Sequence, residues 1–231
     1  MQIEILADAD AVARRAAAFI AAEAASAVAA RGRFAAAVSG GRTPWDMLRA
    51  LASLPLPWSD IHLFQVDERV APAGDPDRNL THLRETLAAA AGLPAANVHP
   101  MPVEAPDLAA AAADYAHVLE ALAGTPPVLD LVHLGLGPDG HTASLCPGDP
   151  VLGVTTADVG VTGLYLGHRR MTLTYPVLNR ARRVLWLVTG AEKATMLARL
   201  RTGDASIPAG RVESEHTLIL ADRAAAGAAP P

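Results

Sequence analysis

The stretch that decides the fold is Val128-Leu-Asp-Leu-Val-His-Leu134, followed directly by Gly135-Leu-Gly-Pro-Asp-Gly-His-Thr-Ala-Ser-Leu145. The first segment is an apolar run of the kind that forms a buried strand. The second segment begins with closely spaced glycines, so we expect a turn there and a helix after it. In an open α/β sheet ligands bind where strands end, and this turn carries Asp139 and His141.

Short apolar segments alternate with helical patterns along the rest of the chain. A long helix is expected from Asp8 or Asp10 to Arg31, with Gly32 as its stop signal. Strands are predicted at 34–38, 61–66, 129–134 and 184–188, with further ones at 171–174 and 217–220, and helices at 44–54, 80–91, 108–122 and 191–200. This alternation predicts a three-layer α/β/α fold around a doubly wound, mostly parallel sheet. We expect one domain over 1–231, with a frayed tail at 224–231.

Composition narrows the range of partners. The formal net charge of −5 and the absence of a Lys/Arg-rich run argue against a nucleic-acid or anionic-membrane surface, and leave a small-molecule substrate as the expected partner. Cys146 is the only cysteine, so no intrachain disulfide can form. With no signal peptide or membrane span in the sequence, we expect a cytoplasmic protein. The oligomeric state stays open.

A second glycine turn follows a strand at Val38-Ser-Gly-Gly-Arg-Thr-Pro44. We expect Thr43 to cap the next helix, with Pro44 in its first position and Asp46 completing a capping box. The backbone at Gly40 and Gly41, with Arg42 beside it, is suited to holding a phosphate at a helix N-terminus. A tight structural connection with an exposed arginine explains the residues equally well.

Charged side chains follow two more strands. Asp67 and Arg69, in Val66-Asp-Glu-Arg69, are candidates to orient a base and to bind a phosphate or an oxyanion, although three adjacent charges are ordinarily a solvated turn. Lys193 lies in the first turn of a predicted helix, where a cation is unfavourable unless an anion is near. Arg170 precedes the predicted strand at 171–174 and is a further candidate cation.

The segment from Gly135 to Gly140 formally matches a dinucleotide fingerprint, but Asp139 would stand where the pyrophosphate must approach, so we reject that interpretation. His141 is better interpreted as a general base, with Asp139 or Asp67 holding its tautomer. For an isolated histidine, a capping or structural role is the usual alternative. No zinc motif or serine-hydrolase elbow is present in the sequence, which disfavours a structural or hydrolytic zinc site and a serine hydrolase of the α/β type.

Five segments carry these candidates: Ser39-Gly-Gly-Arg-Thr-Pro44, Asp67-Glu-Arg69, Gly135-Leu-Gly-Pro-Asp-Gly-His-Thr-Ala-Ser-Leu145 with Pro147-Gly148, Arg170-Met-Thr-Leu173 and Gly190-Ala-Glu-Lys193. In order and spacing, from about residue 34 to 193, the set resembles the 6-phosphogluconolactonase family, within the superfamily that also holds glucosamine-6-phosphate isomerases. The resemblance implies hydrolysis of 6-phospho-D-glucono-1,5-lactone in the oxidative pentose phosphate pathway, without metal or organic cofactor. The chain departs from the family at Arg42, where serine is frequent, at Arg78 and at Cys146.

The expected mechanism has His141 take a proton from water while that water attacks the lactone carbonyl, with a carboxylate positioning the imidazole and Arg69 or backbone amides binding the oxyanion. The candidates for the phosphate are Gly40, Gly41, Arg42, Thr43, Arg170 and Lys193. The alternatives are an amino-sugar-phosphate deaminase or isomerase of the same fold and a non-catalytic sugar-phosphate sensor. The deaminase pattern usually has an aromatic residue where this chain has Arg69.

Overall fold

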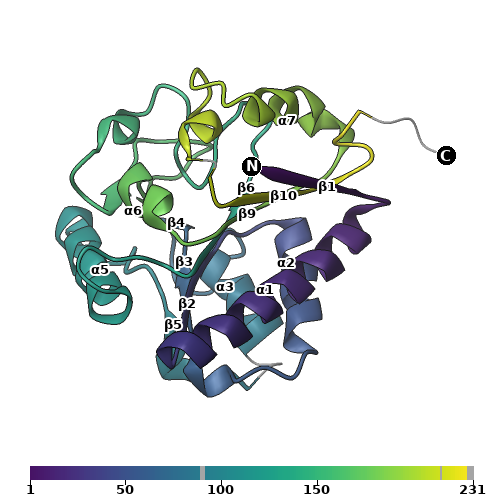
Figure 1. Cartoon of the computed structure of the whole chain (residues 1–231). Coiled ribbons are helices and arrows are strands. Elements are labelled where there is room, and N and C mark those ends of the chain that lie inside the picture. The colour runs from purple at the N-terminus through teal and green to yellow at the C-terminus, as the bar shows by residue number, and fades with distance from the viewer. Residues whose placement is uncertain (89–91, 214, 228–231) are drawn as a thin grey trace.

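A parallel sheet of seven strands forms the centre of the computed structural model, which describes residues 1–88, 92–213 and 215–227 (Figure 1). The strand order is β1-β10-β9-β6-β2-β3-β5, and every pairing is parallel. The strands are β1 (Gln2–Leu6), β2 (Phe34–Val38), β3 (Ile61–Gln65), β5 (Val98–His99), β6 (Leu131–Gly135), β9 (Val184–Val188) and β10 (Thr217–Asp222). Every residue of β2 and β9 is buried, because helices cover both faces of the sheet. The predicted fold class is confirmed.

Helices cover the two faces of the sheet as separate layers (Figure 1). One face carries α1 (Ala9–Arg31), α2 (Arg42–Ala52) and α3 (Asn79–Leu83), and the other carries α5 (Leu108–Ala123), α6 (Tyr175–Arg180) and α7 (Ala194–Arg201). Successive side chains of a strand point to opposite faces of the sheet, so they enter two separate hydrophobic cores. Leu131 and Leu185 pack in the core beside α1 and α2, whereas Val132 and Trp186 pack in the core beside α5 and α7. Among the described residues, no helix is both long and apolar enough to cross a membrane.

Helix α1 begins and ends where its capping residues predict. The Asp8 side chain accepts a hydrogen bond from the Ala11 amide at 2.8 Å, which satisfies one of the free N–H groups of the first turn. At the other end Gly32 has a left-handed φ of 74° and donates its amide to the Val28 carbonyl.

A second, antiparallel sheet stands apart from the main one. It contains β4 (Asp67–Arg69), β8 (Arg170–Leu173) and β7 (Val159–Val161), in the order β4-β8-β7. The strand predicted at 171–174 therefore exists, but it pairs with β4 and β7 and not with the main sheet. The periodicity of a short apolar run does not say which strand it pairs with, and here the partner strand, β4, lies far away in the sequence.

The three residue pairs of the β4–β8 ladder are separated by 101 residues at Arg69 and Arg170, by 103 at Glu68 and Met171, and by 105 at Asp67 and Thr172. Such long-range pairing leaves no local mark on the sequence, so the second sheet could not be predicted from it. The ladder matters for the site because it sets Arg69 directly opposite Arg170.

The segment that follows β6 consists of turns and irregular backbone and forms no α-helix. The prediction of a helix there is wrong. Gly140 and Ala143 both have left-handed φ values, of 84° and 51°, which break any helical run, and Pro147 has no amide to donate. The cap expected at Thr43 is also wrong, because α2 begins at Arg42, two residues before the predicted start at Pro44, and its N-cap is Gly41 with a φ of 129°. Asp46 makes no capping box and pairs with Arg49.

Other boundaries differ more modestly from expectation. Of the helix predicted at 80–91, residues 79–83 are α-helical and 84–88 form a π-helical turn, while 89–91 lie outside the described residues. Strands β1 and β5 were not predicted, because β1 is a half-exposed edge strand and β5 has only two residues. Of the tail expected to fray, 224–227 forms a hydrogen-bonded turn with Ala225 buried, and 228–231 lies outside the described residues.

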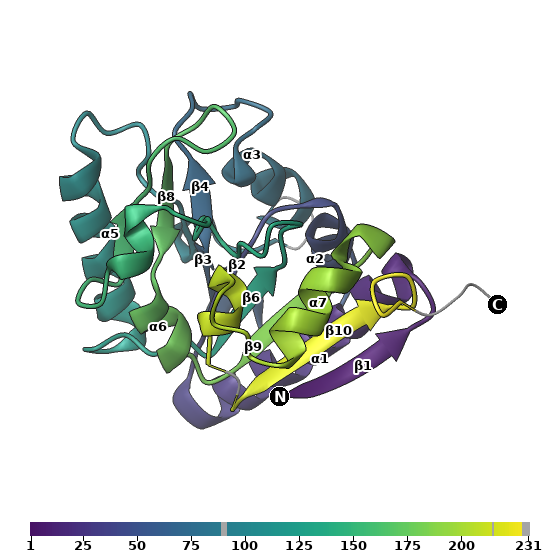
Figure 2. The ribbon, with the colours of Figure 1, turned by 90° about the horizontal axis from the view of Figure 1, so that it is seen from above.

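The order of the strands creates a switch point between β2 and β6. From β2 the chain proceeds to β3 and β5 on one side, whereas β6 is followed by β9 and β10 on the other. Loops that leave two such neighbouring strands diverge, and the crevice between them is where doubly wound sheets bind ligands. Both glycine turns, after β2 and after β6, begin at this place in the centre of the sheet (Figure 2).

Candidate active site

A pocket of about 190 Å³ lies at the switch point. It brings together residues from the turns after β2 and β6, from β4 and β8, and from the segment before α7. They are Ser39, Gly40, Asp67, Arg69, Asn79, Gly135, Leu136, Gly137, Pro138, His141, Ala143, Arg170 and Lys193. A neighbouring cavity of about 560 Å³ shares Gly40 and Lys193 with this pocket and is lined by Gly41, Arg42 and Thr43. All the predicted site residues except Asp139 line one of these two cavities.

His141 and Asp139 form a hydrogen-bonded pair at the edge of the pocket. The Asp139 Oδ1 atom lies 2.6 Å from His141 Nδ1 and also accepts the His141 backbone amide at 3.1 Å. A carboxylate at Nδ1 holds the proton on that nitrogen and leaves the lone pair on Nε2. Gly137 makes room for the ring, because a Cβ there would lie 2.1 Å from His141 Nδ1.

The hydrogen bonds around Asp139 keep it ionised. Burial alone raises the pKa of this carboxyl group, but the backbone amide and ring of His141 and the hydroxyl of Tyr165 stabilise its charged form more strongly, so the net pKa is lowered. Tyr165 donates to Asp139 Oδ2 at 3.0 Å. The sequence offered no reason to select Tyr165, because it lies in a Gly- and Thr-rich segment, 148–167, with no clear strand or helix pattern.

Asp67, the other carboxylate considered for His141, is engaged elsewhere. Its side chain is buried and accepts a hydrogen bond from Ser144 Oγ at 2.6 Å. The side-chain amide of Asn79 donates from Nδ2 to the Asp67 backbone carbonyl at 2.9 Å. Asp67 therefore ties β4 to the turn that carries His141, and the structure places Asp139 beside the imidazole.

Arg69 and Arg170 lie opposite each other on β4 and β8, and both line the pocket. Arg69 donates to the backbone carbonyl of Asp77 and to Asn79 Oδ1. Arg170 is only 6% exposed, its Nε atom has no hydrogen-bond partner, and no carboxylate lies within ion-pair distance of it in the described part of the chain. Burying a guanidinium without a counter-ion costs free energy, so the charge of Arg170 favours the binding of an anion in this pocket.

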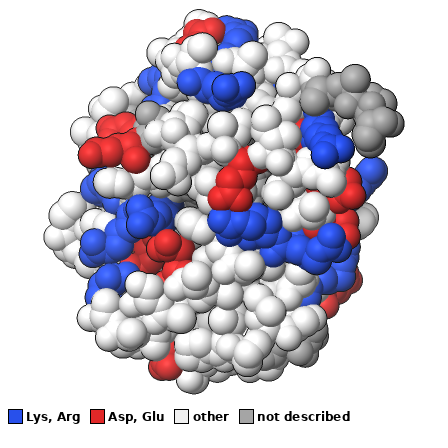
Figure 3. All heavy atoms as spheres, turned by 45° about the vertical axis from the view of Figure 1, so that its right-hand side comes forward, with Lys and Arg blue, Asp and Glu red and all other residues white. Residues whose placement is uncertain are grey.

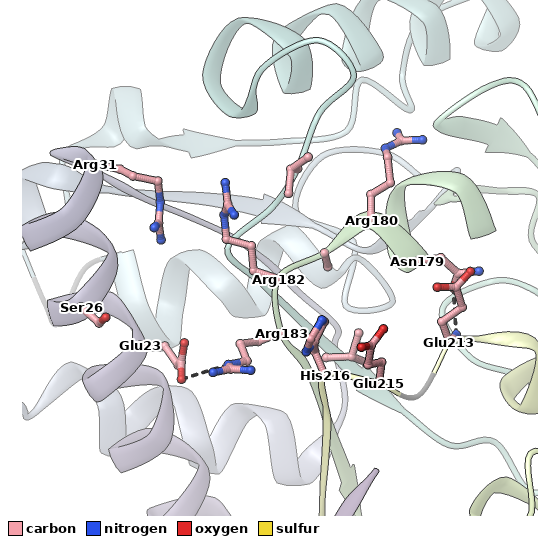
Figure 4. Close-up of a pocket in the computed structure, with 13 residues that line it drawn as sticks. Glu23, Ser26, Arg31, Asn179, Arg180, Arg182, Arg183, Glu213, Glu215 and His216 are labelled. Carbon is pink, nitrogen blue, oxygen red and sulfur yellow. Dashed lines mark hydrogen bonds and ion pairs between the residues drawn. The ribbon is translucent and has the colours of Figure 1, made fainter.

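A larger cavity, of about 570 Å³, lies at the opposite, amino-terminal edge of the sheet, and it has a different electrostatic character (Figure 4). Its arginines are paired with carboxylates of the protein. Arg31 and Arg182 share Asp130 at 2.7 and 3.4 Å, Arg183 pairs with Glu23 at 3.3 Å, and Arg180 pairs with Asp158. Although this cavity is larger, its charges are already balanced, so we place the site in the smaller pocket.

Charge on the outer surface is mixed as well. On the face shown in Figure 3, blue Lys and Arg side chains lie next to red Asp and Glu side chains. Within the described ranges 1–88, 92–213 and 215–227, no group of three or more His, Cys, Asp or Glu side chains is placed to hold a metal ion.

Glu68 holds the two ends of the loop between β4 and α3 beside the pocket. The sequence did not indicate this role. Its side chain is fully buried and accepts hydrogen bonds from Gln65 Nε2 at 2.7 Å and from the amides of Arg69, Asn79 and Leu80, each at 2.8 Å. The buried Arg78 guanidinium lies 3.2 Å away. The three adjacent charges at 67–69 are thus part of a buried strand and not a solvated turn.

Replacing Glu68 by glutamine is expected to destabilise the protein by about 3 kcal/mol, because it leaves Arg78 without its buried counter-ion and removes an acceptor for the loop amides. The change keeps the volume of the side chain, so no cavity contributes. Urea unfolding measures the loss. The matched control is Glu104→Gln: this carboxylate also faces Arg78, at 3.8 Å, but is 56% exposed and is expected to contribute less than about 1 kcal/mol. Equal effects of the two changes would contradict the prediction.

Comparison with known proteins identifies the family. The model of the family described as glucosamine-6-phosphate isomerases/6-phosphogluconolactonase matches residues 7–220. The chain belongs to this family. The resemblance expected from the five sequence segments is thereby confirmed.

Individual members of the family match over nearly their whole length. The 6-phosphogluconolactonase of Synechocystis is 38% identical over 226 residues, which cover 94% of this chain and 93% of that protein. The 6-phosphogluconolactonase of Mycobacterium tuberculosis is 39% identical over 242 residues, covering 99% and 98%. The crystal structure of the 6-phosphogluconolactonase of Thermotoga maritima has a TM-score of 0.85 at 28% identity, covering 96% and 98%. A monomeric glucosamine-6-phosphate deaminase has a TM-score of 0.87 at 19% identity, with 98% and 99% of the chains covered, and shares the fold.

Proposed function

We propose that this chain hydrolyses 6-phospho-D-glucono-1,5-lactone to 6-phospho-D-gluconate in the oxidative pentose phosphate pathway. The observation that carries the proposal is a pocket that joins the His141–Asp139 pair to the buried Arg170, which has no ion-pair partner in the described part of the chain. One half is suited to activating water and the other to binding a phosphate. The full-length relatives named 6-phosphogluconolactonase support this substrate in particular.

In the proposed reaction, His141 Nε2 accepts a proton from a water molecule as the water oxygen bonds to the lactone carbonyl carbon. Asp139 stabilises the imidazolium that forms. The tetrahedral intermediate then collapses, the bond between the carbonyl carbon and the ring oxygen breaks, and the imidazolium returns its proton to the departing oxygen. Arg69, whose buried Nε atom has no hydrogen-bond partner among the described residues, is our candidate to stabilise the negative charge that develops on the carbonyl oxygen.

We assign the substrate phosphate chiefly to Arg170 and Lys193. Lys193 lines both adjoining cavities and precedes α7, where its charge is favourable only beside an anion. Thr43 Oγ1 already bonds to Thr189 Oγ1 at 2.7 Å, and Arg42 is exposed, so these two residues are the weaker candidates. The backbone at Gly40 and Gly41 completes the wall beside Lys193. A phosphate anchored here orients the lactone carbonyl toward His141.

The proposal is tested by following acid release from freshly generated 6-phosphogluconolactone and subtracting its spontaneous hydrolysis. We expect a saturable rate that is proportional to protein concentration. Release of ammonia from glucosamine 6-phosphate, measured in parallel, tests the deaminase alternative and is expected to be absent. A lactone signal that never exceeds the spontaneous rate would overturn the proposed function.

A further inference from the structure

A tight hairpin between β7 and β8 brings one aromatic residue to the active site. Tyr165 and His168 pair across the turn, with Tyr165 N donating to the His168 carbonyl at 3.0 Å and His168 N donating in return at 3.3 Å. Between them Leu166 and Gly167 have left-handed φ values of 49° and 85°, as a two-residue hairpin turn requires. Leu164 and Leu166 are 79% and 78% exposed, whereas Tyr165 is partly buried against the site.

Tyr165 contacts three residues of the site at once. Its hydroxyl donates to Asp139 Oδ2 at 3.0 Å. Its ring meets the His141 ring edge-on, with the centroids 5.5 Å apart, and the Arg170 guanidinium carbon lies 5.0 Å from the Tyr165 ring centroid. One side chain therefore joins the base, the carboxylate that holds the base, and the cation assigned to the phosphate.

The two oxygens of Asp139 are divided between two neighbours. Oδ1 accepts from the amide and the ring of His141, while Oδ2 accepts from Tyr165. Because Asp139 lies in an irregular turn, its carboxylate would be free to rotate if only Oδ1 were held. The Tyr165 hydroxyl supplies the second point of attachment and fixes the plane of the carboxylate.

The hairpin makes a second contact with the rest of the protein through His168. His168 Nε2 lies 3.2 Å from Asp77 Oδ2, in the segment that leads from β4 to α3 (Figure 2). Burial and the hydrogen bond to Asp139 raise the pKa of Tyr165, so its hydroxyl stays protonated and able to donate at neutral pH. The donor is thus both held in place and kept in the required state.

We propose that Tyr165 is a positioning residue for the lactonase reaction: by fixing Asp139 it keeps the proton of His141 on Nδ1 and the lone pair of Nε2 directed into the pocket. This inference rests on the proposed function. Tyr165 does not line the pocket itself; its hydroxyl acts chiefly through Asp139, at 3.0 Å, and lies farther, at 3.4 Å, from His141 Nδ1.

Replacing Tyr165 by phenylalanine removes only the hydroxyl and keeps the ring beside His141 and Arg170. We expect kcat to fall about tenfold, since a hydrogen bond to a charged group is lost, while KM changes by less than about twofold. Tyr165→Ala should lower kcat similarly and also raise KM, because Arg170 then loses the ring it packs against. Leu164→Ala, at the exposed tip of the same hairpin, is the matched control and should leave both constants unchanged.

A second measurement does not depend on turnover. In protein labelled with 15N in its histidines, the His141 resonances, assigned with His141→Asn, report which ring nitrogen carries the proton. We expect the Nδ1–H tautomer in the wild type and a mixture of tautomers in Tyr165→Phe, approaching the spectrum of Asp139→Asn. An unchanged tautomer together with unchanged kcat in Tyr165→Phe would overturn the positioning role. A wild type that failed to hydrolyse the lactone would overturn the proposed function. In that case the NMR measurement still tests the positioning of His141, and a tautomer unchanged by Tyr165→Phe would overturn it.

Discussion

Replacing His141 by asparagine is expected to lower kcat for 6-phosphogluconolactone by about 10²- to 10⁴-fold, the usual contribution of a general base. The structure gives the reason: Asp139 occupies Nδ1 at 2.6 Å, so Nε2 is the nitrogen left to accept a proton from water. Asparagine has no basic nitrogen and cannot take that proton. Background-corrected acid release measures the loss.

Product binding separates a catalytic loss from a structural one. Arg170 and Lys193 are intact in His141→Asn, so 6-phosphogluconate should still raise its melting temperature. His117→Asn is the matched control, because His117 lies on α5 with its side chain 76% exposed and should tolerate the change without loss of kcat. If His141→Asn kept more than about a tenth of the wild-type kcat, contrary to this role for a base, another residue would have to be the base.

Arg170→Met is expected to raise KM for the lactone by about a hundredfold, the loss that follows from removing one partner of a buried charge pair. The ligand-free protein should become more stable in the same variant. The reason is that Arg170 is 6% exposed, lies opposite Arg69, and has no carboxylate within ion-pair distance among the described residues. An apolar side chain of similar length relieves that cost.

Steady-state kinetics measure the change in KM, and thermal unfolding with and without 6-phosphogluconate measures the change in stability. The ligand should stabilise the wild type and have little effect on Arg170→Met. Arg183→Met is the control: Arg183 lines the cavity at the opposite edge and pairs with Glu23, so its loss should not change KM (Figure 4). An unchanged KM in Arg170→Met would show that the phosphate binds elsewhere.

Local features of the sequence were enough to predict the alternation of strands and helices. The central strands β2 and β9 are continuous apolar runs, and α1 carries its own start and stop signals at Asp8 and Gly32. The glycine turns at 39–41 and 135–140 could be placed at strand ends for the same reason. Parallel strands put their carboxyl ends at one edge, so the candidate residues were expected to converge.

Sequence by itself therefore determined the fold class, the edge of the sheet that holds the site, and His141 as the candidate base. Only the tertiary structure decided that Asp139 holds His141, since Asp67 is hydrogen-bonded to Ser144, and that Arg170 has no counter-ion among the described residues. It also brought Tyr165 to Asp139 and Arg69 to Arg170. These contacts join segments far apart in the chain, and periodicity and capping act only between near neighbours, so nothing local in the sequence encodes them.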